Sequence, residues 1–78
     1  MPDKLIEVFA QGLEVDPASL SDDTSPENTE QWDSLAAMSL VMLLEDSFSV
    51  KLSTREIMKM RSIRIAREVL RAKGVGGI

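Results

Sequence analysis

The 78-residue chain contains no cysteine and no histidine. Without cysteine it has no disulfide framework, no thiolate nucleophile and no cysteine-based metal site. Without histidine it lacks the commonest general base and the commonest metal ligand. The adjacent carboxylates Asp22-Asp23 and Glu45-Asp46 have no partner base in view, and the acidic loop lacks the ligand spacing of a defined metal site. We therefore expect no catalytic residue and no metal ligand, and we predict that the chain is not an enzyme.

Long apolar runs are also missing. The longest stretch, Leu40 to Leu44, is far too short to cross a bilayer. The N-terminus shows no basic segment followed by an apolar run, so no signal peptide is predicted. We expect a cytoplasmic, monomeric protein without membrane insertion. It should form one domain over residues 1–78, with a core at about 3–73 and a flexible tail at 74–78.

Charge is distributed unevenly along the chain. Residues 1–50 carry eleven acids and one base, whereas residues 51–78 carry eight bases and two acids. An acidic surface argues against nucleic acid as a partner and favours a basic protein surface. Arg64, Arg67 and Arg71 repeat at helical spacing, but such a stripe is usually a solvated helix face, and no aromatic residues interleave with it.

Helical periodicity predicts an all-α fold, a four-helix bundle with three longer helices and a short third helix. The expected helices cover residues 3–13, 34–47, 54–59 and 63–73. A long connection rich in polar residues, 14–33, joins the first helix to the second. Its apolar Val15, Leu20 and Trp32 should anchor it to the core, and Ser25-Pro26-Glu27 has the composition of a short helical turn.

Each predicted helix is preceded by a residue suited to cap its N-terminus. Asp3, Asp33 and Ser62 have side chains that accept hydrogen bonds from the amides of a first helical turn. Ser53 stands three residues before Glu56, which is the spacing of a capping box. These four positions set the expected helix starts.

The second helix is apolar on two opposed sides. A core stripe is formed by Ala37, Leu40, Leu44 and Phe48, flanked by Val41 and Leu43. The opposite side carries Leu35, Met38 and Met42, next to the acidic Glu45 and Asp46. Either the long loop covers this second side or a partner protein docks on it, and methionine suits an adaptable docking surface.

Asp33-Ser34-Leu35 begins this helix and places a hydroxyl at its positive end, where an anionic group is favoured. Asp-Ser pairs are common helix starts, so these three residues alone are weak evidence for a function. The order and lengths of the helices, the acidic loop, and the helix end at Glu45-Asp46-Ser47-Phe48 resemble the acyl carrier protein family. The resemblance extends from Leu5 to about Lys73.

This resemblance implies that Ser34 carries 4'-phosphopantetheine, obtained from coenzyme A, through a phosphodiester. It implies that Asp33 helps a phosphopantetheinyl transferase to act on the serine. Acyl-loading and acyl-accepting enzymes would be the further partners, docking on a shared set of residues: Leu35, Met38, Met42, Glu45, Asp46 and Met58. An acyl chain would fold back among Leu40, Leu44, Phe48 and Ile63.

The chain departs from fatty-acid carriers where those present acids on the second and third helices. Ala36 and Ser39 replace acids on the second helix, and the third helix region offers Arg55, Lys59 and Arg61. This favours a dedicated lipid, polyketide-like or other secondary pathway. A peptidyl or aminoacyl carrier and an unmodified helical interaction module remain as alternatives.

Overall fold

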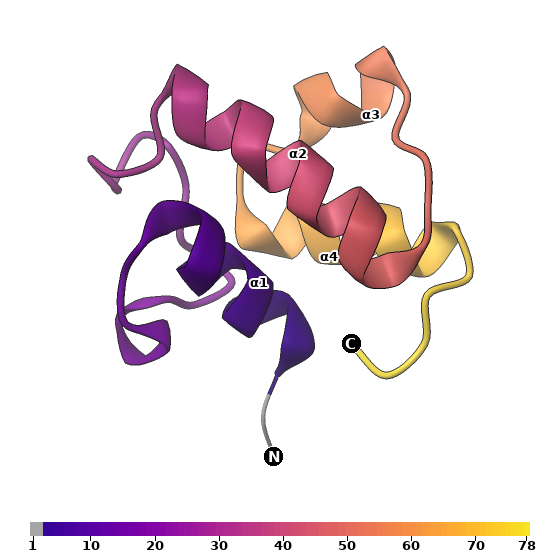
Figure 1. Ribbon diagram of the computed structural model, residues 1–78, viewed down its shortest axis with the longest axis horizontal. Helices are drawn as coiled ribbons and strands as arrows, with labels where there is room; N and C mark the ends of the chain where they lie inside the picture. The colour runs from indigo at the N-terminus through magenta and orange to yellow at the C-terminus, as the bar shows by residue number, and fades with distance from the viewer. Residues whose placement is uncertain (1–2) are drawn as a thin grey trace.

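The computed structural model describes residues 3–78 and is built from helices (Figure 1). The elements are α1 (Lys4–Leu13), the 3-10 helix η1 (Pro17–Ser19), α2 (Ser34–Phe48), α3 (Thr54–Lys59) and α4 (Ile63–Ala72). No strand occurs in this part of the chain. The predicted all-α bundle with a short third helix is confirmed.

All four α-helices begin where the capping residues predict. Asp3 accepts from the amides of Leu5 and Ile6, and Asp33 accepts from the amide of Ala36. Ser53 and Glu56 form a reciprocal capping box, and Ser62 accepts from the amide of Ile65. Such bonds lie within one turn, so each start is determined locally.

The core lies between α1, α2 and α4, and the short α3 packs against α4 (Figure 1). Its fully buried large side chains are Phe9, Leu5, Leu44, Ile63 and Leu70. α1 and α2 approach closely at Gly12, where an added Cβ would lie 2.5 Å from Leu40 Cδ2. A larger residue on α1 at this crossing would require the side chains of Leu40 and Leu43 to shift.

The loop between α1 and α2 differs from the prediction. Its short helical element is η1, where Asp16 Oδ1 accepts from the amide of Ala18 at 2.9 Å. The segment at Ser25-Pro26-Glu27 is a turn, because the Asn28 side chain accepts from the Ser25 amide at 2.9 Å and Asn28 N donates to Ser25 O. The expected turn at 25–27 is therefore present, but it does not extend into a helix. Proline after an aspartate begins the helical element at η1 instead.

The arginine stripe of α4 also differs from the prediction. Arg64 and Arg71 are exposed, but the Arg67 side chain is only 11% exposed. Arg67 binds Asp3 at 2.7 Å and Asp22 at 2.9 Å, joining α4 to the start of α1 and to the loop. The hydrogen bond from Arg67 lowers the pKa of Asp3, and the bond to Asp3 raises the pKa of Arg67. Arg67 therefore forms largely buried ion pairs that connect three segments, and it is not part of a solvated helix face.

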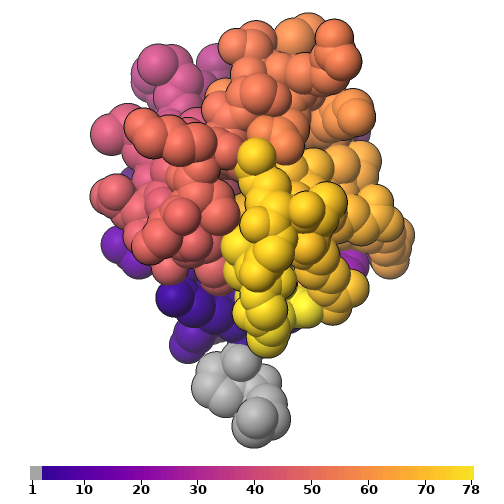
Figure 2. All heavy atoms as spheres, turned by 90° about the vertical axis from the view of Figure 1, so that its right-hand side faces the viewer, coloured from indigo at the N-terminus to yellow at the C-terminus, as the bar shows by residue number. Residues whose placement is uncertain are grey.

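Residues 74–78 lie against the body of the domain (Figure 2). Val75 and Ile78 pack against the core, and Arg71 Nε donates to Ile78 O at 2.7 Å. The flexibility expected of this segment stays a prediction. Among the described residues, no helix has the length and apolar character needed to cross a membrane.

Candidate functional site

Ser34 is the first residue of α2, and its side chain is exposed. Asp33 holds the helix start, since its Oδ1 accepts from Ala36 N and its carbonyl accepts from Ala37 N, both at 2.9 Å. The amides of Ser34 and Leu35 come before these bonds, where a helix has no acceptor of its own to offer. An exposed hydroxyl beside two such amides fits a covalently attached, negatively charged phosphodiester.

A hollow of about 450 Å³ opens beside Ser34. It lies between the start of α2 and the region of α3, and it is lined by Pro26, Trp32, Asp33, Ser34, Ala37, Ile57, Met58, Met60 and Arg61. A much smaller gap of about 30 Å³ shares four of these residues and reaches Phe9, Leu40, Val41 and Leu44 in the core. The four shared residues are apolar and separate the hollow beside the serine from the gap in the core.

Trp32 lies between the hollow and the inner gap and lines both of them. Its ring lies 5.2 Å from that of Phe9, centroid to centroid, in a tilted arrangement, and Trp32 is only 7% exposed. Of the residues expected to surround an acyl chain, Leu40 and Leu44 line the inner gap, whereas Phe48 and Ile63 do not. Because the gap is small, an acyl chain entering it would have to displace side chains.

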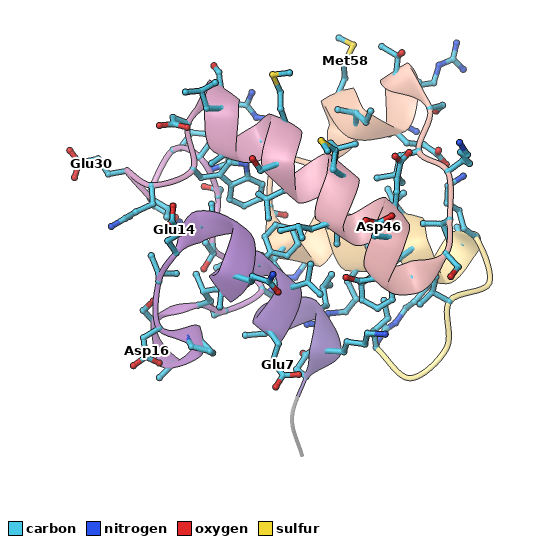
Figure 3. All side chains as sticks on the ribbon, in the orientation of Figure 1. Glu7, Glu14, Asp16, Glu30, Asp46 and Met58 are labelled. Atoms are coloured by element: carbon cyan, nitrogen blue, oxygen red, sulfur yellow. The ribbon has the colours of Figure 1, made fainter. Side chains whose placement is uncertain are left out.

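The second apolar side of α2 is uncovered. Leu35, Met38 and Met42 are 77%, 67% and 68% exposed, and Met58 of α3 is 72% exposed. Figure 3 shows Met58 projecting outward from α3. The long loop sends its apolar Trp32 into the core instead of over these residues. The structure thus leaves an apolar surface of four large side chains next to Ser34, which we call the docking face.

The two acids predicted beside this face differ in their contacts. Asp46 is exposed on α2 (Figure 3). Glu45 is half-buried, and its Oε2 accepts from the amide of Leu52 at 2.8 Å. Glu45 therefore holds the segment between α2 and α3, a role that sequence reasoning missed because this bond bridges an irregular connection with no motif.

An ion pair stands at the rim of the hollow. Arg61 lines the hollow and binds Glu27 of the loop, and both side chains are exposed. The hydrogen bond from Arg61 lowers the pKa of Glu27. Other acids of α1 and the loop, namely Glu7, Glu14, Asp16 and Glu30, point outward in Figure 3. Among the described residues, no group of three or more acids is arranged to hold a metal ion.

Comparisons with known proteins agree with this geometry. Residues 3–64, which include Ser34 and most of the hollow, match the family model described as a phosphopantetheine attachment site. The chain is also 31% identical over 75 residues to an acyl carrier protein of Syntrophus aciditrophicus (strain SB), covering 96% of this chain and 94% of the relative. The chain therefore belongs to the acyl carrier protein family, the phosphopantetheine-binding domains that carry 4'-phosphopantetheine covalently.

Proposed function

We propose that this chain is an acyl carrier protein with its 4'-phosphopantetheine on Ser34, serving a dedicated lipid, polyketide-like or other secondary pathway. The observation that carries the proposal is the exposed Ser34 hydroxyl at the start of α2, beside a hollow of about 450 Å³. Family membership supports the attached group. We infer further that the chain catalyses no reaction itself and works as a cytoplasmic monomer.

Ser34 and Asp33 have different roles in the attachment of the group. Ser34 Oγ forms a bond to phosphorus as the bond to the nucleotide part of coenzyme A breaks, and the hydroxyl proton is released. Asp33 fixes the helix start, so that the amides of Ser34 and Leu35 face the phosphodiester. Once attached, the group supplies a thiol on a flexible arm, which a chain without cysteine cannot supply itself.

Partner enzymes would recognise the surface next to this anchor. We propose that Leu35, Met38, Met42 and Met58 supply the apolar contacts and that Asp46 supplies the acidic one. Exposed methionines adapt to different partner surfaces because the thioether side chain is flexible and polarisable. Glu45 contributes through its second carboxylate oxygen, since the first is bonded to Leu52 N.

The charges of α3 support a dedicated pathway over general fatty-acid synthesis. Arg55 and Lys59 are exposed on α3. The fatty-acid carriers that this chain resembles present acids on that helix instead. An enzyme suited to an acidic carrier would meet like charge there. We expect fatty-acid elongation enzymes to turn over this carrier poorly, and turnover equal to that of the housekeeping carrier would contradict this assignment.

Intact mass tests the attachment. The protein is incubated with coenzyme A and a broad-specificity phosphopantetheinyl transferase, and we expect a gain of one phosphopantetheinyl group. Ser34→Ala should abolish the gain. Ser39→Ala, which removes another exposed hydroxyl on α2, should leave it intact.

The alternatives give other outcomes. No mass gain in the wild-type chain would favour an unmodified helical interaction module. A peptidyl or aminoacyl carrier would gain the same mass, but an adenylating enzyme would load it with an amino acid, while acyl-loading enzymes would not.

A further inference from the structure

The cations of the chain separate into two groups by their contacts. Of the nine lysines and arginines, six bind a carboxylate or a backbone carbonyl. Within residues 3–78, the structure gives no hydrogen bond or ion pair to the side chains of the other three, Lys51, Arg55 and Lys59. All three lie on α3 or on the segment that leads into it, so the unpaired positive charge is concentrated at one place.

The acid of α3 does not neutralise this charge. Glu56 accepts from Ser53 N at 2.9 Å and pairs with Lys73 at 2.9 Å, and its side chain is 27% exposed. The hydrogen bond from the Ser53 amide, reinforced by Lys73, lowers the pKa of Glu56. Glu56 is thus held by the capping box and by α4, and the exposed charged side chains of α3, Arg55 and Lys59, are both positive.

These cations border the surface that surrounds Ser34. Ile57 and Met58 of α3 line the hollow beside the serine. At 100° per residue, the surface of α3 runs from Ile57 through Met58 to Arg55 and then Lys59. A protein that covers Met58 while reaching Ser34 therefore places its edge against Arg55 and Lys59.

The other edge of the docking face has the opposite sign. On α2, the helical wheel puts Asp46 beyond Leu35 and Met42, on the flank away from Glu45 and the hollow. Across the face, the order is Asp46 at one edge, an apolar centre with the half-buried Glu45 on its α3 side, and two bases on α3. This order is asymmetric, so it sets the orientation of a partner as well as its charge.

We propose that α3 is the charge-selective part of the docking face and that the dedicated partner enzyme places an acidic patch against Arg55 and Lys59 while covering Met58. The argument is charge complementarity: two exposed, unpaired cations next to an exposed apolar side chain are best matched by carboxylates around an apolar socket. This inference rests on the proposed function, because it takes Ser34 as the point that the partner approaches.

The test uses a fatty-acid β-ketoacyl synthase as the probe, in its native form and in a form whose carrier-facing lysines and arginines are replaced by glutamate. Dissociation constants are measured for the apo chain, so that the result does not depend on the arm. We expect the wild-type chain to bind the glutamate form about tenfold more tightly than the native form, with the difference shrinking at high salt. R55E/K59E should reverse this preference.

Two control variants separate the effect of the charges on α3 from the effect of the net charge of the chain. R55Q/K59Q and Q11E/A18E lower the net charge by the same amount, but Gln11 and Ala18 lie on α1 and η1, away from α3 (Figure 1). The first pair should abolish the preference for the glutamate form, and the second should keep it. The circular dichroism of each variant shows that it is folded.

Two outcomes overturn the proposal: the wild-type chain prefers the native synthase, or Q11E/A18E changes the preference as much as R55Q/K59Q. Loss of mass gain at Ser34 would instead contradict the proposed function. The apo binding ratios would still decide the role of α3 in that case.

Discussion

The two sides of this domain use their charged residues differently. On the side built from α1, α4 and the long loop, Arg64 pairs with Asp23, and Arg67 pairs with Asp3 and Asp22. On the side built from α2 and α3, the exposed Asp46, Arg55 and Lys59 form no ion pair within residues 3–78. The arginines of the first side thus hold separate segments together, whereas Asp46, Arg55 and Lys59 on the second side have no ion-pair partner among the described residues.

The largest difference between the sides should appear in apolar truncations. Phe9→Ala removes a fully buried ring that contacts Trp32 and should lower the free energy of unfolding by about 3–5 kcal/mol. Met42→Ala, on the docking face, should change it by less than about 0.5 kcal/mol. Urea unfolding followed by Trp32 fluorescence measures both. A comparable cost for Met42→Ala would mean that the docking face is part of the core.

The next largest effect should come from the paired arginines. Arg67→Met leaves Asp3 and Asp22 without their shared partner and should cost about 2 kcal/mol of unfolding free energy. Arg64→Met is the matched control one turn away, where both members of the pair with Asp23 are exposed, and it should cost less than about 0.5 kcal/mol. Equal costs in urea unfolding would remove the distinction between internal and surface pairs on α4.

A smaller effect should be seen as pH is lowered. The pKa of Asp3 is below its usual 3.8 in the folded chain, chiefly through the hydrogen bond from Arg67. The unfolded chain therefore takes up this proton first, and the stability due to Asp3 is complete above 3.8 and is lost as pH falls through the folded pKa. Asp3→Asn should flatten the fall of the unfolding free energy below pH 4. In an Arg67→Met background, the same substitution should have a smaller effect on that slope, because only the amides of Leu5 and Ile6 would still lower the pKa of Asp3.

The smallest effect is expected at the rim of the hollow. Glu27→Gln removes the partner of Arg61, but both side chains are exposed, so the free energy of unfolding should not change measurably. Modification of Ser34 by the transferase, followed as the rate of mass gain, should also stay within about twofold. A large loss of stability would show that the loop depends on this pair. The Arg61–Glu27 pair would then resemble the pairs of Arg67, which hold separate segments together.

What the sequence predicts best is what short-range bonds determine. Asp3, Asp33, Ser53 and Ser62 each cap a helix within one turn, so their spacing alone locates the four helix starts. The position of Ser34 at the start of α2 follows from the same local pattern. The exposure of the second apolar side of α2 does not, because the sequence leaves open whether the loop covers it.

What the sequence could not predict depends on contacts between distant segments. Arg67 is separated from Asp3 by 64 positions, and nothing in its helical stripe distinguishes it from Arg64. Glu45 meets Leu52 N through an irregular turn, and the hollow beside Ser34 exists only because the loop brings Pro26 and Trp32 next to α3. Such features require the packed chain.

The crossing at Gly12 has a mechanical consequence. An added Cβ would lie 2.5 Å from Leu40 Cδ2 and 3.2 Å from Leu43 Cδ1, so the side chains of α2 leave little free space beside α1 at this crossing. α3 is six residues long and has no buried residue of its own. If the inner gap widens to admit an acyl chain, we therefore expect α3 to move more than the close crossing of α1 and α2, and Met58, Arg55 and Lys59 would move with it.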